Sequence, residues 1–319
     1  MTWTPYYRGN QSEGERPSAP VELPPLPPWR QARAHVPFEP PLGLAGAVNA
    51  ALLLRRPLLL TGSPGAGKST VALSIAQELG LGGVLRWHIT SRSTLVDALY
   101  RYDALGRLHA RQHKEDDSPE RFLRLGPLGT ALAAVDRPRV LLIDEIDKSD
   151  IDLPSDLLDV LERGSFEIDV LKRHTVDEVR VRLDVADGED DVADDARCTI
   201  ARGVVRGGRD QFPVIVMTSN GEREFPPPFL RRCVRFPMPD PDSDQLTKIV
   251  NAHLKDLDEE TQAAIQDLIK AFAGRIGKPE VLATDQLLNA VYLVTREFPP
   301  EGDQREQLVR LLTKDLSSA

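Results

Sequence analysis

The sequence has few of the residues that mark secreted, metal-stapled or membrane-spanning proteins. Its two cysteines, Cys198 and Cys233, have neither the spacing of paired metal ligands nor a partner pattern, so they predict reduced thiols and no structural metal. No apolar stretch approaches the roughly 18 residues that a membrane span needs, and no basic start leads into an apolar run. These absences predict a cytoplasmic protein with no membrane partner.

Aromatic residues and excess positive charge are also scarce. Aromatics make up 5% of the chain, the formal net charge is −9 and the isoelectric point is near 5.3. This composition argues against a protein that coats nucleic acid through general electrostatic attraction, although a local basic patch remains compatible with it. The chain has 319 residues, of which 41% are hydrophobic, which allows a sizeable core and about two domains.

Proline is concentrated at the start of the chain. Residues 1–41 contain ten of the 26 prolines and show neither a helical nor a strand period. Such a segment cannot bury a core of its own. We therefore expect an extended N-terminal tail over 1–41 that lies on its own or a neighbouring subunit, with binding to an aromatic-lined groove as the alternative.

A glycine-rich turn follows the apolar run Leu58-Leu59-Leu60 and precedes a helical pattern that starts at Val71. Its glycines allow consecutive backbone N–H groups to turn inward, and the following helix directs its positive end at the same anion. Lys68 is expected to reach the β- and γ-phosphates of a nucleotide, Ser69 to bind Mg²⁺, and Thr70 to support them. The predicted phosphate-binding residues are Gly62, Ser63, Pro64, Gly65, Ala66, Gly67, Lys68, Ser69 and Thr70.

Two further polar positions come at the ends of apolar runs. Residues 140–143 are fully apolar and lead into Asp144 and Glu145, as expected for a parallel strand covered on both faces. Ligands bind at the carboxyl ends of such strands, so Asp144 is predicted to act on Mg²⁺ through its water shell and Glu145 to polarise the attacking water. Asn220 ends the next buried run and is placed to bind the γ-phosphate or that water.

The order of the remaining patterns predicts a parallel α/β sheet followed by helices. Helix 42–54 leads into strand 57–61, the later strands are expected at 84–89, 140–145, 214–220 and 234–236, and the pattern after Pro237 is purely helical. The expected domains are the tail 1–41, an α/β nucleotide-binding domain at 42–238 and a small helical lid at 239–319.

Two long excursions interrupt this order, at 90–129 and at 165–210. The second contains an acidic run over 184–195, interpreted as a solvated loop tip. It also contains a basic piece over 202–209, interpreted as a flexible hairpin end, with a grip on an acidic substrate or nucleic acid as the alternative.

Taken together, these landmarks resemble the AAA+ ATPases, specifically the MoxR-like branch related to gas-vesicle GvpN-type and dynein-related modules. The resemblance runs from about Leu42 to about Glu297. It implies a P-loop core with a helical lid, in which the glycine-rich turn is Walker A, Asp144 and Glu145 end Walker B, and Asn220 is sensor 1. The two excursions match the helix-2 insert and the hairpin before sensor 1.

The resemblance also implies an arginine finger in the segment Phe229-Leu230-Arg231-Arg232, where one arginine reaches the γ-phosphate of the neighbouring subunit. Arg231 and Arg232 are both candidates, and either could instead cap the preceding helix or pair with an acid. Relatives carry a sensor 2 arginine in the lid. Here Lys278 stands in the corresponding stretch and lacks the planar fork of arginine, with Arg275 as its rival.

These inferences predict a Mg²⁺-dependent ATPase that forms a ring, a hexamer by family resemblance, and remodels or activates an unidentified client protein. One alternative is a motor acting on nucleic acid, similar to restriction-associated AAA+ GTPases, which would hold phosphates with Arg202, Arg206 and Arg209. Another is a nucleotide-dependent switch or scaffold in a bacterial conflict or signalling system. The Asp144–Glu145 pair argues against an inactive enzyme.

Overall fold

The computed structural model describes residues 22, 26–27, 38–134, 136–173, 177–187, 196–208, 211–254, 259–276, 282–295 and 302–315. Most of the predicted tail 1–41 lies outside the described residues. The chain divides into two compact units. The larger comprises Pro40–Gly62 and Gly67–Pro239, while the smaller includes the loop tip Ser63–Ala66 and the helices after Asp240.

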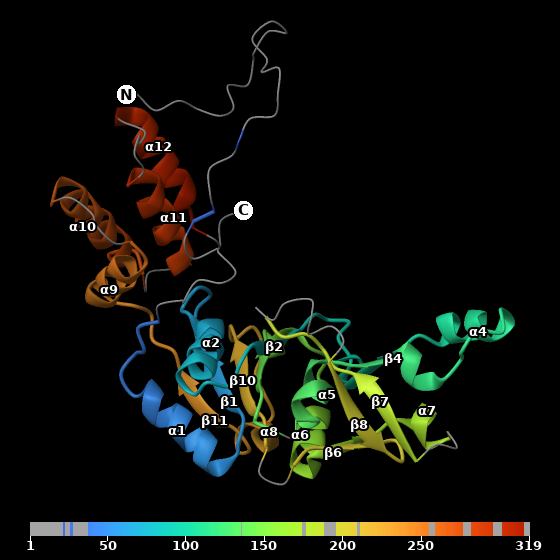
Figure 1. Ribbon diagram of the computed structural model, residues 1–319. Coiled ribbons are helices and arrows are strands. Elements are labelled where there is room, and N and C mark those ends of the chain that lie inside the picture. Colours follow the sequence, from blue (N-terminus) through green and yellow to red (C-terminus); the bar gives the residue numbers. More distant parts are fainter. Residues whose placement is uncertain are drawn as a thin grey trace, which may run out of the picture. The chain divides into compact units, whose positions relative to one another are not determined.

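Five parallel strands form sheet A at the centre of the larger unit (Figure 1). Across the sheet they are β11 (Val234–Pro237), β1 (Leu58–Thr61), β10 (Val214–Ser219), β5 (Val140–Asp144) and β2 (Val84–His88). All four neighbouring pairs are parallel. The predicted parallel α/β core is therefore confirmed, and each strand lies within about two residues of its predicted range.

Sheet A is covered on both faces, which explains its continuous apolar strands. Helices α1 (Leu44–Leu54) and α2 (Lys68–Glu78) contact it on one face. Leu141 and Ile143 on the other face share a core with α5 (Pro127–Leu132) and α6 (Leu153–Arg163). Helix α6 ends at Arg163, because Gly164 adopts the left-handed conformation at its C-terminus.

The two excursions meet in a second sheet, sheet B, which the sequence patterns did not reveal. Its strands in spatial order are β3 (Tyr100–Tyr102), β4 (Leu123–Leu125), β7 (Glu178–Arg182), β8 (Arg197–Ala201), β9 (Val204–Arg206) and β6 (Ser165–Glu167). Strands β3 and β4 come from the first excursion and the other four from the second. The two sets join where β4 pairs with β7 in parallel, with Arg124 opposite Arg182.

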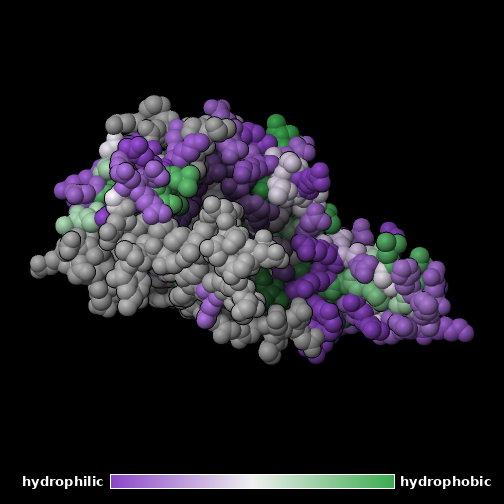
Figure 2. All heavy atoms as spheres, turned by 90° about the horizontal axis from the view of Figure 1, so that it is seen from above, coloured by the Kyte–Doolittle hydropathy of each residue, from purple (hydrophilic) through white to green (hydrophobic). Residues whose placement is uncertain are grey.

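Short helices complete the excursions: α3 (Leu95–Leu99), α4 (Ala104–Gln112), η3 (Pro119–Phe122) and α7 (Asp169–Lys172). Helix α4 projects beyond sheet B at the far right of Figure 1. Hydrophobic and hydrophilic side chains are intermingled on this projection (Figure 2), where Leu105 and Leu108 are 70% and 51% exposed.

Helix α5 contacts both sheets. All six of its residues are buried, and it contacts β2 and β5 of sheet A as well as β4 and β9 of sheet B. Val181 and Ile200 of sheet B consequently belong to the same apolar core as Leu141 of sheet A. Sheet B is therefore part of the hydrophobic core of the larger unit.

The smaller unit contains helices α9 (Ser243–His253), α10 (Glu259–Ala273), α11 (Thr284–Val294) and α12 (Gly302–Leu312). The apolar faces of α9, α10 and α11 form a separate core around Leu246, Ile269 and Leu287. The purely helical pattern after Pro237 is thus confirmed. Within the described residues, no helix is both long and apolar enough to cross a membrane.

Candidate functional site

The glycine-rich turn lies between β1 and α2. Gly62 has φ of +151°, and a Cβ atom there would lie 2.7 Å from the carbonyl oxygen of Met238, so glycine is required. Gly67 has φ of +77° at the start of α2. Residues Ser63, Pro64, Gly65 and Ala66 form the loop tip, and Thr70 lies in the first turn of the helix. This geometry gives the nine predicted phosphate-binding residues one continuous loop leading into a helix N-terminus.

The Lys68 side chain is buried against the phosphate-binding loop. The residue is 7% exposed. Its Nζ donates a hydrogen bond of 2.7 Å to the carbonyl of Gly62. The ammonium group is thereby folded back over the loop, at the place where a phosphate would replace the carbonyl as its acceptor.

Two hydroxyl groups meet at the end of β5, one from the start of α2 and one from β10. Ser69 Oγ donates to Asp144 Oδ1 over 2.7 Å, and Thr218 Oγ1 donates to the same oxygen over 2.6 Å. Strands β1, β10 and β5 are neighbours in sheet A, so their carboxyl ends bring these side chains together. The sequence gives no sign of this contact, because threonine is common in strands for its β-propensity alone.

Glu145 leaves the strand instead of continuing it. Its φ of +61° is in the left-handed region, which costs an L-residue about 1 kcal/mol, and its N–H donates to Thr218 Oγ1 over 2.9 Å. Lys148 Nζ pairs with Glu145 Oε2 at 2.8 Å, and Asn220 Nδ2 donates to Oε1 over 3.4 Å. His88 Nε2 also lies 3.8 Å from Oε2.

The Lys148 contact raises the pKa of that lysine, mainly because its ammonium donates a hydrogen bond to the Glu145 carboxylate. Lys148 lies in the short helix η4 (Ile146–Lys148), directly after Glu145. In this conformation both carboxylate oxygens of Glu145 therefore have partners, one cationic and one neutral.

A buried carboxylate holds the loop that carries Asn220. Asp147 is 4% exposed, and its Oδ2 accepts from the backbone N–H groups of Asn220 over 2.9 Å and Glu222 over 3.0 Å. Asp147 thus ties the end of β10 to the residues after β5. The sequence predicts a role for Asn220 but not for Asp147, because nothing in the order of residues indicates that Asp147 is buried.

The two candidate finger residues follow helix α8 (Pro227–Leu230). Arg232 Nε forms an ion pair of 2.5 Å with Glu162 Oε1 of α6. Arg231 is exposed, and its side chain has no ion pair among the described residues; its carbonyl accepts from Arg56 Nη1 over 3.0 Å. Pairing with an acid, the alternative role considered for both residues, is therefore found for Arg232.

One of the two sensor 2 candidates falls within the described part of the chain. Lys278 lies outside the described residues. Arg275 follows α10 and donates from Nη1 to Thr313 Oγ1 over 3.3 Å, a contact within the smaller unit.

Comparison with known proteins identifies a family for the part of the chain that holds these residues. A family model described as "ATPase family associated with various cellular activities (AAA)" matches residues 58–238, which is more than half of the chain. Comparison with curated protein sequences gives no match.

Solved structures that match the chain include NtrX from Brucella abortus in complex with ATP and a variant of RuvB from Thermotoga maritima. The NtrX match has 14% identity and a TM-score of 0.38, and covers 83% of this chain and 53% of NtrX. The RuvB match has 13% identity and a TM-score of 0.39, and covers 84% of this chain and 66% of RuvB. The chain therefore spans about half of NtrX and about two thirds of RuvB.

Proposed function

The chain belongs to the AAA family of ATPases, and on that premise we propose that it is a Mg²⁺-dependent, MoxR-like ATPase that works as a ring on a partner protein. The observation that carries the proposal is the convergence of Ser69 and Asp144 on one another, 2.7 Å apart, directly behind the phosphate loop. The loop N–H groups and Lys68 supply the positive field for the phosphates.

The donor set suits Mg²⁺. The Ser69 hydroxyl and the Asp144 carboxylate are hard oxygen donors that Mg²⁺ accepts together with water and phosphate oxygens. When bound, the ion would neutralise charge on the β- and γ-phosphates. Ser69 can keep its hydrogen bond to Asp144 while its lone pairs face the cation, so the present contact orients a ligand.

Glu145 is the proposed general base, and Asn220 orients the water or the γ-phosphate. The carboxylate must first exchange its contact with Lys148 for one with the water, since Lys148 Nζ holds Oε2 at 2.8 Å. Asp147 keeps Asn220 within reach through the backbone. In the present conformation Glu145 is therefore ion-paired with Lys148, and we propose that nucleotide binding breaks this contact.

Ring formation is supported by the two arginines after α8. Arg231 is exposed and has no ion pair among the described residues, so it is the better candidate for reaching a neighbouring subunit. Arg232, which pairs with Glu162, is the candidate for an intramolecular role. A finger acting between subunits makes a lone chain a slow enzyme. A hexamer is proposed by analogy with the MoxR-like branch. We also propose that the lid 239–319, including Lys278, closes during turnover. The tail 1–41 is proposed to lie along its own or a neighbouring subunit.

The test is the rate of ATP hydrolysis per subunit at increasing protein concentration, with the mass of the assembly measured alongside. We expect the rate to rise with assembly and to fall by about 10³-fold or more in Arg231→Ala, the scale of an arginine finger, with ATP binding retained. Arg232→Ala tests the alternative assignment, and Arg235→Ala, at an exposed site on β11, is the matched control.

A rate that is independent of concentration and of both arginines contradicts the ring mechanism. That result favours a switch whose site is complete in one subunit. Loss of ATP binding in Arg231→Ala would instead assign that residue to the binding site of its own chain.

A further inference from the structure

A row of four arginines crosses four neighbouring strands of sheet B, namely β3, β4, β7 and β8. Each arginine is the register partner of the next, and in order they are Arg101, Arg124, Arg182 and Arg197. Neighbouring strands lie about 4.8 Å apart, so the four residues fall within about 14 Å. We call this set the arginine row.

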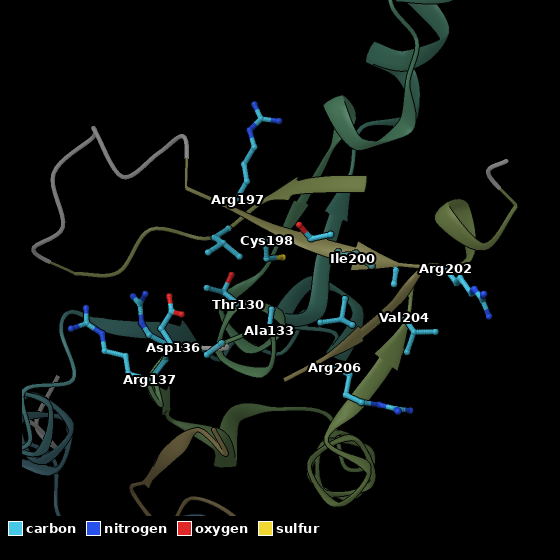
Figure 3. Close-up of a pocket in the computed structure, with 16 residues that line it drawn as sticks. Thr130, Ala133, Asp136, Arg137, Arg197, Cys198, Ile200, Arg202, Val204 and Arg206 are labelled. Atoms are coloured by element: carbon cyan, nitrogen blue, oxygen red, sulfur yellow. The ribbon is translucent and has the colours of Figure 1, made fainter. Parts of the chain in front are cut away.

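The arginine row is on the outer face of the sheet. Val179 and Val181 of β7 are buried, and Arg182 alternates with them at an exposed position. Figure 3 shows the other end of the row, where the Arg197 side chain extends away from Thr130 of the buried helix α5. The row therefore faces away from the apolar core.

Two members of the row are held within the chain. Arg124 Nε lies 3.7 Å from Asp184 Oδ1, and Arg197 also has an interaction inside the chain. Arg101 and Arg182 differ from them, since both are exposed and neither forms an ion pair with any residue that the structure describes. The positive charge that the row offers to a ligand is therefore that of Arg101 and Arg182.

Electrostatic repulsion makes the row costly for the free chain. Like charges directly opposite one another destabilise a sheet, and the row contains three such pairs. The nearby Asp184 gives limited relief, because burial raises the pKa of its carboxyl group and Arg124 and Arg101 counteract this only in part. An anionic group that spans the row would remove the repulsion. The row therefore suits a partner with several negative charges.

We propose that the arginine row binds an acidic α-helix of a partner protein, laid across the strands. Carboxylates on one face of a helix recur every three or four residues, which is about 4.5 or 6 Å along the axis. The arginines recur about every 4.8 Å, whereas same-face side chains of an extended peptide recur about every 6.7 Å. Guanidinium groups bind carboxylates through two parallel hydrogen bonds.

Nucleic acid fits the same face less well. None of the outward-facing residues of these four strands is aromatic, whereas the binding of single strands relies on base stacking. A duplex is a long polyanion, which the net charge of −9 of the chain repels more strongly than a short helix. These features favour a protein segment over nucleic acid.

The inference names the kind of partner that the proposed ATPase holds, and it rests on that function for its role. Binding itself needs no nucleotide and is measured on the full-length chain without ATP. Loss of binding therefore leaves the hydrolysis proposal standing, and loss of hydrolysis in Glu145→Gln leaves the binding unchanged.

Two fluorescent alanine-based peptides of about 20 residues probe the helix pattern, and anisotropy measures their binding. In the aligned peptide four glutamates follow one face at spacings of four, three and four residues. In the dispersed peptide the same four glutamates are distributed around the helix. We expect the aligned peptide to bind about tenfold more tightly, and its affinity to fall as salt is added.

The double variant Arg101→Gln, Arg182→Gln tests the row itself. Its affinity for the aligned peptide should fall by about tenfold or more, because both available charges are removed. Its midpoint of urea unfolding should stay the same or rise, because repulsion within the sheet is relieved. The matched control is Arg111→Gln, Lys114→Gln, at exposed positions on and just after α4, which removes the same charge and should leave the affinity unchanged.

Four results each overturn the proposal: equal binding of the two peptides, no binding of the aligned peptide, unchanged affinity in Arg101→Gln, Arg182→Gln, or a lower unfolding midpoint in that variant. The last result would make the row a structural support. Binding that begins only after Glu189, Asp190 and Asp191 are replaced by their amides would assign the row to the chain's own acidic run. A duplex oligonucleotide that displaces the aligned peptide and binds more tightly would assign it to nucleic acid.

Discussion

Sheets A and B share one core but are built by different rules. In β5 of sheet A, four consecutive residues from Val140 to Ile143 are buried, and the strand ends at the proposed chemistry. In β7 of sheet B, buried Val179 and Val181 alternate with exposed residues. The first pattern places functional groups at strand ends, because the faces are covered. The second pattern leaves one face of the strand exposed.

The contrast places the proposed turnover at the carboxyl ends of sheet A. The largest expected effect concerns turnover. Glu145→Gln should lower the hydrolysis rate by about 10² to 10⁴-fold, the usual contribution of a general base, and leave ATP bound. The matched change in sheet B is Glu178→Gln at an exposed position of β7, which should leave the rate unchanged. Unaltered hydrolysis by Glu145→Gln would remove the base from its proposed role.

The next effect concerns stability and tests whether both faces of sheet A are covered. Leu142→Ala in β5 should lower the free energy of unfolding of the larger unit by about 2–5 kcal/mol, since a fully buried leucine is replaced by a cavity. Arg180→Ala, at an exposed position of β7, should change it by less than about 0.5 kcal/mol. Denaturant titration followed by circular dichroism measures both. Similar costs for the two variants would mean that the sheets do not differ in coverage.

A smaller effect is expected at Asp147, which binds the backbone of the loop after β10 at Asn220 and Glu222. Asp147→Ala removes the acceptor of two backbone N–H groups, and a hydrogen bond to a charged group contributes about 1.5–3 kcal/mol. The maximal hydrolysis rate should fall while the affinity for ATP changes little, because Asn220 moves and the phosphate loop does not. Asp147→Asn retains one acceptor oxygen and should recover part of the loss. A drop in ATP affinity equal to the drop in rate would contradict a positioning role.

The smallest difference concerns the two thiols. Burial raises the pKa of Cys198, in β8 of sheet B, to about 11, and that of Cys233, just before β11 of sheet A, to about 12. Near pH 8.5 alkylation of both should be slow in the folded chain, with Cys198 about tenfold faster than Cys233 because its thiolate fraction is larger. Mass spectrometry of the labelled peptides measures the ratio. Faster labelling of Cys233 would reverse the order of protection.

The same shifts make stability depend on pH in one direction. A folded thiol with a raised pKa holds its proton more tightly than the unfolded thiol, whose ordinary value is 9.0. Its contribution to the free energy of unfolding is therefore complete below about pH 9 and declines as the pH rises through 11 for Cys198 and 12 for Cys233. Cys198→Ala and Cys233→Ala should each flatten this decline over its own interval.

Much of sheet A could be predicted because its strands are local apolar runs bounded by glycine or polar residues. The closeness of Ser69 and Asp144 also followed, since parallel strands bring their carboxyl ends to one edge. Side chains that matter through burial were missed: nothing in the order of residues distinguishes Asp147 from an exposed acid. The role of Lys148 was missed for a similar reason, because its contact depends on the left-handed turn at Glu145.

Sheet B was harder to predict because its pairing is not local. Val179 and Val181 alternate with exposed residues, as in a half-buried strand, but no period in either excursion shows that β4 will pair with β7. The choice between Arg231 and Arg232 was undecided in the sequence for the same reason. The two residues are adjacent, and they differ only once α6 brings Glu162 against Arg232.

The β4–β7 junction has a consequence for modularity. Each excursion supplies part of one sheet, and Arg124 reinforces the junction by donating from Nε to the carbonyl of Leu183 over 3.2 Å. A chimaera that exchanges residues 90–129 alone therefore removes the native parallel partner of β7. Exchange of 165–208 alone removes the native parallel partner of β4. The two segments form a single graft, although sheet A strand β5 and helix α6 separate them in the chain. Variation acquired by one excursion is tolerated only in the context of the other.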